Sequence, residues 1–220
     1  MTHWPPSVMQ EIDATNTNTW HIPTNEDGDA FEPLARFFHE PLVGSAVKNM
    51  PVFITFPSLK DQEWSVKHPG KTSCQMLVMA EYSWFESFRG QTDKDRVAGY
   101  EELKKIWVDR CLEVFYVYFP KSRGKVEVAD LSTPLTIEHY LRADKGGAVG
   151  IDVTPQRFTD PSVRDLLDVK SPIPGLFLTG QDTVLCGVTL CQLAGVITAF
   201  RMSGLWSAAK ILATSILLGD

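Results

Sequence analysis

Apolar residues recur along this chain at two different spacings, and each spacing predicts a different kind of element. The runs 50–56 (MPVFITF) and 73–80 (SCQMLVMA) are rich in β-branched and large apolar residues and have the length of strands, and residues 19–22 form a shorter run of the same kind. Between residues 95 and 118, apolar side chains instead recur at steps of three and four, with charges between them. This spacing predicts an amphipathic helix that stops before Pro120.

Shorter elements complete the predicted fold. The sequence indicates a short helix at 31–38, a long charged connection at 60–72, a short strand at 125–128, a helix that starts at Thr133-Pro134, and a strand at 176–179. Strands and helices alternate irregularly. The pattern therefore predicts an α+β fold, with a mixed sheet flanked by helices.

The C-terminal fifth of the chain is its most apolar part. Residues 183–200 form the longest uncharged run, eighteen residues, whereas a membrane span needs about 20 mainly apolar residues. A buried helix is therefore favoured over a span. The tail 206–218, with Lys210 as its only charge, fits either a packed terminal helix or a helix lying on a membrane surface.

Composition narrows the classes of function. A net charge of −6 argues against a nucleic-acid partner, because no basic stripe is present to neutralise phosphates. The four cysteines lie in apolar runs, which favours reduced thiols, and no cleavable targeting peptide is visible at the start. The five histidines do not pair at metal-ligand spacing, and the common hydrolase motifs are missing. We assign no metal ligand and no acid–base residue.

One motif carries most of the chemical information. The segment 175–182 (GLFLTGQD) predicts a buried strand that ends at Gly180 and places a carboxylate at Asp182, and a helix is expected to begin near Gly187. A helix N-terminus offers unpaired N–H groups and a partial positive charge, and glycines let a flat or anionic ligand approach the backbone. The alternative is a plain strand-to-helix turn in which Asp182 acts as a cap.

This motif resembles the flavin-closing motif at the C-terminus of the phytoene desaturase, carotenoid isomerase and retinol saturase group of FAD-dependent oxidoreductases. Further matches to that group occur upstream in the same order, and together they cover about residues 15 to 210. They include the segments 56–61 (FPSLKD), 68–71 (HPGK), 82–86 (YSWFE), 133–136 (TPLT) and 171–174 (SPIP).

The resemblance implies three regions. They are a polar N-terminal segment (1–30), a mixed α/β region like the family's substrate domain (31–170), and a flavin-closing strand and helix with an apolar tail (171–220). The family binds its dinucleotide at an N-terminal Gly-x-Gly-x-x-Gly turn, and the nearest approximation here, residues 146–150, has the wrong spacing and is interpreted as a turn. The N-terminal Rossmann half is therefore expected to be absent.

The resemblance also assigns residues to the cofactor. Asp182 would contact the ribityl and phosphate region of FAD, while Gly180, Gly187 and Val188 would bring backbone close to the flavin. The chain departs from the family at Leu190, where the family keeps a very small residue.

Aromatic residues are the expected lining of a substrate channel. Tyr82, Trp84, Phe85 and Phe88 match a segment of the family's substrate domain, and aromatic walls suit a long apolar polyene such as a retinoid or carotenoid. The alternative from spacing alone is a packed amphipathic helix.

The resemblance implies the C-terminal part of an FAD oxidoreductase that acts on a polyene double bond, a CH–CH group. Without a dinucleotide-binding half, the chain is not expected to be active alone. FAD is the cofactor by resemblance, and this chain by itself is not expected to hold the adenine half of FAD. Two alternatives stay open: a degenerate, non-catalytic binding or structural subunit of a larger complex, and a split enzyme in which a partner chain supplies the missing half. The family also suggests peripheral membrane contact, at the endoplasmic reticulum or in a plastid.

Overall fold

The computed structural model describes residues 12–39, 49–90, 94–152 and 154–218. The chain divides into two compact units, an N-terminal unit (Met1–Tyr140) and a C-terminal unit (Leu141–Asp220), and each is described by itself. The boundaries predicted from the sequence, at 30/31 and 170/171, stay predictions. Residues 1–11 of the predicted polar segment lie outside the described residues.

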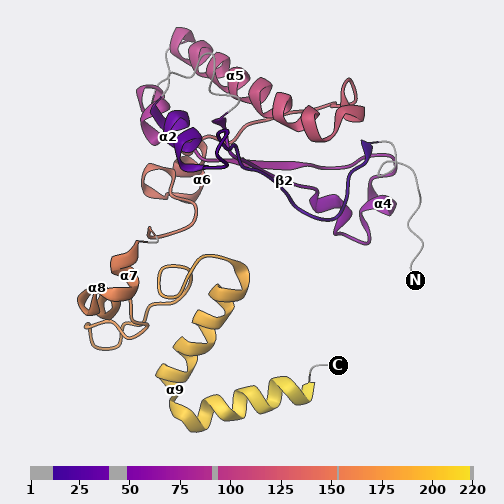
Figure 1. Cartoon of the computed structure of the whole chain (residues 1–220). Helices are drawn as coiled ribbons and strands as arrows, with labels where there is room; N and C mark the ends of the chain where they lie inside the picture. The colour runs from indigo at the N-terminus through magenta and orange to yellow at the C-terminus, as the bar shows by residue number, and fades with distance from the viewer. Residues whose placement is uncertain (1–11, 40–48, 91–93, 153, 219–220) are drawn as a thin grey trace. The chain divides into compact units, whose positions relative to one another are not determined.

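A three-stranded antiparallel sheet forms the centre of the N-terminal unit (Figure 1). Its strand order follows the sequence: β1 (Thr19–His21), β2 (Val52–Thr55) and β3 (Gln75–Val78). The predicted strands at 19–22, 50–56 and 73–80 and the α+β class are confirmed. Both strand pairs are antiparallel, however, so the expected mixed sheet is wrong for the described strands. Neighbouring strands of the sheet are consecutive in the sequence, and antiparallel pairing of such strands needs no crossover connection.

The connection between β2 and β3 is long, as predicted. It contains two short helical turns, η1 (Pro57–Leu59) and α4 (Trp64–Lys67). The Ser58 hydroxyl accepts a hydrogen bond from the backbone N–H of Ser73 at 2.9 Å and lies 2.6 Å from the hydroxyl of Thr72. These bonds satisfy polar groups at the end of the connection, and Ser58 itself is buried.

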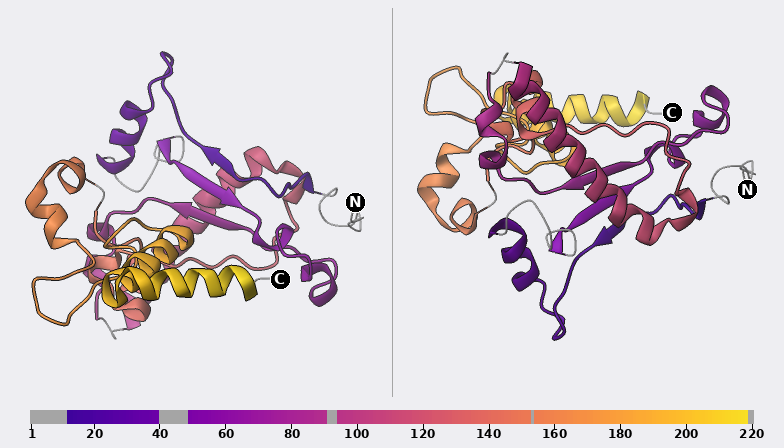
Figure 2. Two further views of the ribbon diagram at one scale, coloured as in Figure 1. Left: turned by 90° about the horizontal axis from the view of Figure 1, so that it is seen from below. Right: turned by 90° about the horizontal axis from the view of Figure 1, so that it is seen from above.

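Helix α5 (Lys94–Tyr118) lies across one face of the sheet (Figures 1 and 2). Phe56, which follows β2, packs against Phe119 and Phe115 with ring centroids 5.0 and 6.2 Å apart. Helix α2 (Phe31–His39) adds Phe37 to the same core. Burial of these aromatic side chains is the main stabilising contribution to this unit. The helices predicted at 31–38 and 95–118 are confirmed.

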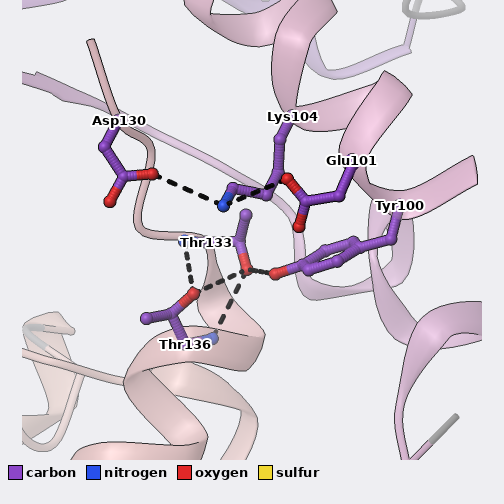
Figure 3. A network of polar contacts seen from close by, with 6 residues as sticks. All are labelled: Tyr100, Glu101, Lys104, Asp130, Thr133 and Thr136. Atoms are coloured by element: carbon purple, nitrogen blue, oxygen red, sulfur yellow. Dashed lines mark hydrogen bonds and ion pairs between the residues drawn. The ribbon is translucent and has the colours of Figure 1, made fainter. Parts of the chain in front are cut away.

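A network of polar contacts attaches the next helix to α5 (Figure 3). The hydroxyl of Tyr100 on α5 lies 2.5 Å from that of buried Thr133, and Thr133 Oγ1 accepts from the N–H of Thr136 at 3.4 Å. Lys104 forms ion pairs with Asp130 and Glu101. Thr133 thus caps α6 (Pro134–Leu141), which confirms the helix start expected at Thr133-Pro134.

The strand predicted at 125–128 is wrong. The backbone there belongs to no strand, and Val128 is 84% exposed. Apolar residues at alternate positions form a strand only where a sheet edge is available to pair with them. Here the segment is held by a side-chain contact instead, an ion pair of 2.8 Å between Glu127 and Lys71.

Short helices and one long helix make up the C-terminal unit. They are η5 (Asp144–Gly146), α7 (Pro155–Thr159), α8 (Pro161–Leu166) and α9 (Val188–Leu218). Helix α9 bends at Gly204, whose φ of 77° and ψ of 163° are non-helical. Buried Ala194 lies on its first half, and Thr198 Oγ1 donates to the carbonyl of Leu178 at 3.0 Å.

The strand predicted at 176–179 is also wrong, because only one isolated bridge, Lys170–Phe177, forms there. The bridge is supported by the N–H of Leu178, which donates to the carbonyl of Val169 at 2.7 Å. The intervening turn contains Pro172 and Pro174, which have no N–H to donate to a ladder. Pairing therefore stops after one bridge.

In the described part of the chain, no helix combines the length and the apolar character needed to cross a membrane. Residues 183–200, the uncharged run, are instead divided between a loop and the start of α9. The alternatives for the tail 206–218 stay open, since it is helical in either case.

A contact between His21 of β1 and Tyr118 of α5 indicates that the stability of the N-terminal unit depends on pH. His21 Nδ1 lies 2.9 Å from the hydroxyl of Tyr118, and burial lowers the pKa of His21. The unfolded chain therefore binds this proton more readily than the folded one, so stability present at neutral pH is lost as the pH falls through the ordinary histidine range. The unfolding temperature of the wild-type chain should be lower at pH 5.5 than at pH 7.5. His21→Gln should make this difference smaller, whereas the control His139→Gln, at an exposed position, should leave it unchanged. An equal decrease in all three proteins would contradict the assignment.

Candidate functional site

The loop between the isolated bridge and α9 contains three of the four residues predicted to contact a cofactor, and the fourth, Val188, is the first residue of α9. Gly180 and Gly187 have φ of +96° and +110°, conformations that favour glycine. Apart from the glycine and its two chain neighbours, no heavy atom of the described residues lies within 4 Å of a Cβ built at either position. Helix α9 begins at Val188, 78% exposed, which confirms the helix start expected near Gly187.

Asp182 is exposed and is held by a bond to its own unit. Its Oδ1 accepts a hydrogen bond from the N–H of Ile151 at 2.9 Å. A Cβ built at Gly150, whose φ is +79°, would lie 2.3 Å from the same oxygen, so only glycine fits there. The turn at 146–150 was predicted from the sequence, whereas its contact with Asp182 was not. The bond fixes the direction of the carboxylate and engages Oδ1 rather than Oδ2.

Arg157 holds the 181–184 loop in place through hydrogen bonds to its backbone carbonyls. Its side chain on α7 is 6% exposed. Nη2 donates to the carbonyls of Asp182 at 2.8 Å, Val184 at 3.0 Å and Gln181 at 3.3 Å, and Nη1 donates to that of Ile151 at 3.0 Å. One guanidinium thus holds together the two segments of the site, the 150–151 turn and the 181–184 loop. Sequence reasoning missed it, because an isolated arginine in a polar stretch carries no recognisable signal.

We tested whether this arrangement fits a flavin. The two glycines leave open space beside the backbone, an exposed carboxylate lies between them, and the N-terminus of α9 follows directly. Unpaired N–H groups at that end favour electron-rich atoms, and a carboxylate accepts bonds from hydroxyl groups. The residues therefore fit a flat group that has both hydroxyls and electron-rich atoms. Leu190, the departure from the family's pattern, is half-buried in the first turn of α9, and its side chain does not fill the space beside Gly180 or Gly187.

The predicted substrate residues lie on or between two short turns of the N-terminal unit, η2 (Tyr82–Trp84) and η3 (Glu86–Phe88), with Phe85 between the turns. The alternative of a packed amphipathic helix is therefore wrong for this segment. Phe85 is 1% exposed and belongs to the core. Trp84 stacks on Trp107 with ring centroids 5.4 Å apart, and Phe88 lies 5.5 Å from the ring of Tyr100. Their predicted role as a polyene channel stays a prediction.

Tyr82 differs from these packed aromatics because its hydroxyl has a charged partner. It donates to Glu138 Oε2 at 2.9 Å, while Arg89 Nη2 donates to Glu138 Oε1 at 2.5 Å. Partial burial raises the pKa of Tyr82, and the bond to Glu138 adds to the rise. The phenol is therefore protonated and donates to the carboxylate. The two predicted sets of residues lie in different units.

Comparison with known proteins gives a consistent set of relatives. An all-trans-retinol 13,14-reductase of Macaca fascicularis is 35% identical over 177 residues, which cover 80% of this chain and 28% of the relative. One of Danio rerio is 36% identical over 143 residues, 65% of this chain and 23% of the relative. A second protein of Danio rerio, named inactive all-trans-retinol 13,14-reductase, is 25% identical over 64% of the chain and 23% of its own length.

No family model and no solved structure matches the chain. The chain spans about a quarter of the length of the curated relatives that it matches. Identity of 34–36% over most of this sequence is shared by four proteins with the same name. The chain is therefore a partial match to a retinol-saturase-like family.

Proposed function

We propose that this chain is the C-terminal part of a flavin-dependent oxidoreductase that acts on a double bond of a retinoid. The observation that carries the proposal is the open, glycine-bounded loop with Asp182 in front of α9, in a chain related to all-trans-retinol 13,14-reductases. FAD is the cofactor by resemblance, and a carotenoid is a possible substrate of the same chemical class.

Within this proposal the bound flavin supplies the redox chemistry, and the chain supplies position. Asp182 would accept a bond from a flavin hydroxyl, with one carboxylate oxygen already oriented by the N–H of Ile151. Arg157 keeps the loop in place, and the N-terminus of α9 would offer N–H groups to electron-rich atoms of the ring. Remaining dinucleotide contacts come from another part of a longer protein or from a partner chain.

The test is equilibrium dialysis of the full chain against FAD, with Asp182→Asn as the variant. Asparagine keeps an oxygen for the N–H of Ile151 but places an NH₂ donor where the carboxylate accepts. We expect FAD affinity to fall about tenfold, the effect of losing one hydrogen bond to a charged group. Asp165→Asn, an equal change of charge on exposed α8, is the matched control.

Equal FAD affinity of wild type, Asp182→Asn and Asp165→Asn would contradict the flavin contact. So would complete absence of FAD binding by the wild-type chain both alone and with a dinucleotide-binding half from one of its relatives.

A binding module without redox chemistry is the second candidate. It is favoured by the bond from Ile151 to Asp182, which satisfies one carboxylate oxygen without any ligand, and by the relative whose name includes the word inactive. Retinol bound by the purified chain, with no FAD bound under any condition, would support this candidate.

A further inference from the structure

The sheet of the N-terminal unit has a second face, which α5 does not cover. Side chains alternate between the two faces of a strand. Val52 and Ile54 of β2 are 1% exposed and belong to the core beside α5, so Phe53 lies on the opposite face. Register places Trp20 of β1 and Leu77 of β3 directly on either side of Phe53.

This row is apolar and open. The rings of Trp20 and Phe53 are 4.6 Å apart, and Trp20 and Leu77 are 65% and 64% exposed. Two residues further along the strands, on the same face, Ile22 and Met79 are 58% and 55% exposed. We call these five residues the open face. Adjacent apolar side chains left this exposed commonly mark a binding surface.

One end of the open face is polar. Thr55, two residues after Phe53 on β2, donates to Asn18 Oδ1 at 2.9 Å. Lys60 Nζ donates to the same Asn18 oxygen at 2.6 Å and to Thr55 Oγ1 at 2.8 Å. An ammonium group carries three donors, so these two bonds leave a third for another acceptor. The face therefore changes from a cationic, hydrogen-bonding end to an apolar track.

Its size fits a small molecule better than a protein. Three strands spaced about 4.8 Å apart and four residues at about 3.3 Å each give a face roughly 10 Å by 13 Å. A stable protein interface needs about 800 Å² on each partner, several times this area. A rod-shaped apolar ligand with a single polar end matches both the dimensions and the polarity.

We propose that the open face binds the polyene of a retinoid, with its terminal hydroxyl at the Asn18, Thr55 and Lys60 end. The inference rests on the proposed function, because the names of the relatives supply the chemical class of ligand. It assigns substrate contact to Trp20, Phe53 and Leu77, residues outside the predicted aromatic set at 82–88.

Fluorescence titration of the full chain with all-trans-retinol tests the apolar track. The double variant Trp20→Gln/Leu77→Gln should bind retinol at least tenfold more weakly, because it removes two apolar contacts. Val117→Gln, which changes a 74% exposed residue on α5, is the matched control and should bind as wild type does. If the double variant does not fold by circular dichroism, Ile22→Gln/Met79→Gln carries the same expectation.

The polar end is tested by ligand choice. Wild type should prefer retinol to the hydrocarbon that lacks its hydroxyl, and Lys60→Met should remove the preference while leaving hydrocarbon affinity unchanged. An equal preference in Lys60→Met and wild type would overturn the orientation of the ligand.

The proposal is overturned if the wild-type chain does not bind retinol, or if the folded double variants bind it as tightly as wild type. The FAD dialysis with Asp182→Asn is an independent readout. If the open-face variants bind retinol more weakly but Asp182→Asn binds FAD as wild type does, the retinoid site on the open face is supported and the flavin contact is rejected. If Asp182→Asn weakens FAD binding but the open-face variants bind retinol as wild type does, only the retinoid site on the open face is rejected.

Discussion

Replacing Phe85 with alanine is expected to lower the free energy of unfolding of the N-terminal unit by about 3–5 kcal/mol, the usual cost of removing a buried phenylalanine. The side chain is 1% exposed, and its ring centroid lies 6.4 Å from that of Trp107. Truncation would leave a cavity beside the indole, which is itself 3% exposed. Denaturant unfolding followed by tryptophan fluorescence measures the loss.

Phe31→Ala is the control, since Phe31 is 81% exposed on α2, and its effect should stay within about 0.5 kcal/mol. The comparison also separates the two interpretations of the 82–88 segment. A small loss of stability in Phe85→Ala, together with weaker retinol binding, would show a channel wall rather than a core residue.

Replacing Arg157 with alanine is expected to cost about 3 kcal/mol in the C-terminal unit, because it removes a buried guanidinium that donates to four backbone carbonyls. The loop 181–184 and the turn at Ile151 both lose their shared anchor. Hydrogen exchange should therefore speed up at the amides of residues 180–190 and of Ile151. Arg157→Lys should restore only part of this stability, because an ammonium keeps the positive charge but cannot donate to the carbonyls of both segments in one planar arrangement.

Arg164→Ala on exposed α8 provides a comparison with the same loss of charge and should leave exchange in the loop unchanged. Equal exchange in Arg157→Ala and wild type would mean that the loop is held by other contacts, and Arg157 would lose its role as a positioning residue.

The hydrophobic periodicity of the sequence predicted the strands and helices that bury one face. It could not predict features that depend on contact with another element of the fold. Phe53 and Phe56 belong to the same predicted strand, yet they lie on opposite faces, one on the open face and the other in the core. The sequence could not show which face α5 covers. The predicted strands at 125–128 and 176–179 are wrong for a related reason, since strand formation needs a neighbour with free donors.

The loop motif was predictable because glycine is required where φ is positive, and Gly180 and Gly187 both have such values. The contacts that hold this loop in place could not be predicted. Arg157 and Gly150 reach the loop from about 25 to 30 residues earlier in the chain, and no local pattern indicates such a contact.

Hydrogen exchange of the full chain with and without FAD tests the central claim most directly, because it locates the contact without requiring catalysis. We predict that FAD slows exchange at the amides of residues 180–191 in wild type and in Asp165→Asn, and much less in Asp182→Asn. Protection that is absent from this loop, or that is the same in Asp182→Asn as in wild type, would contradict a flavin contact at Asp182 and the N-terminus of α9.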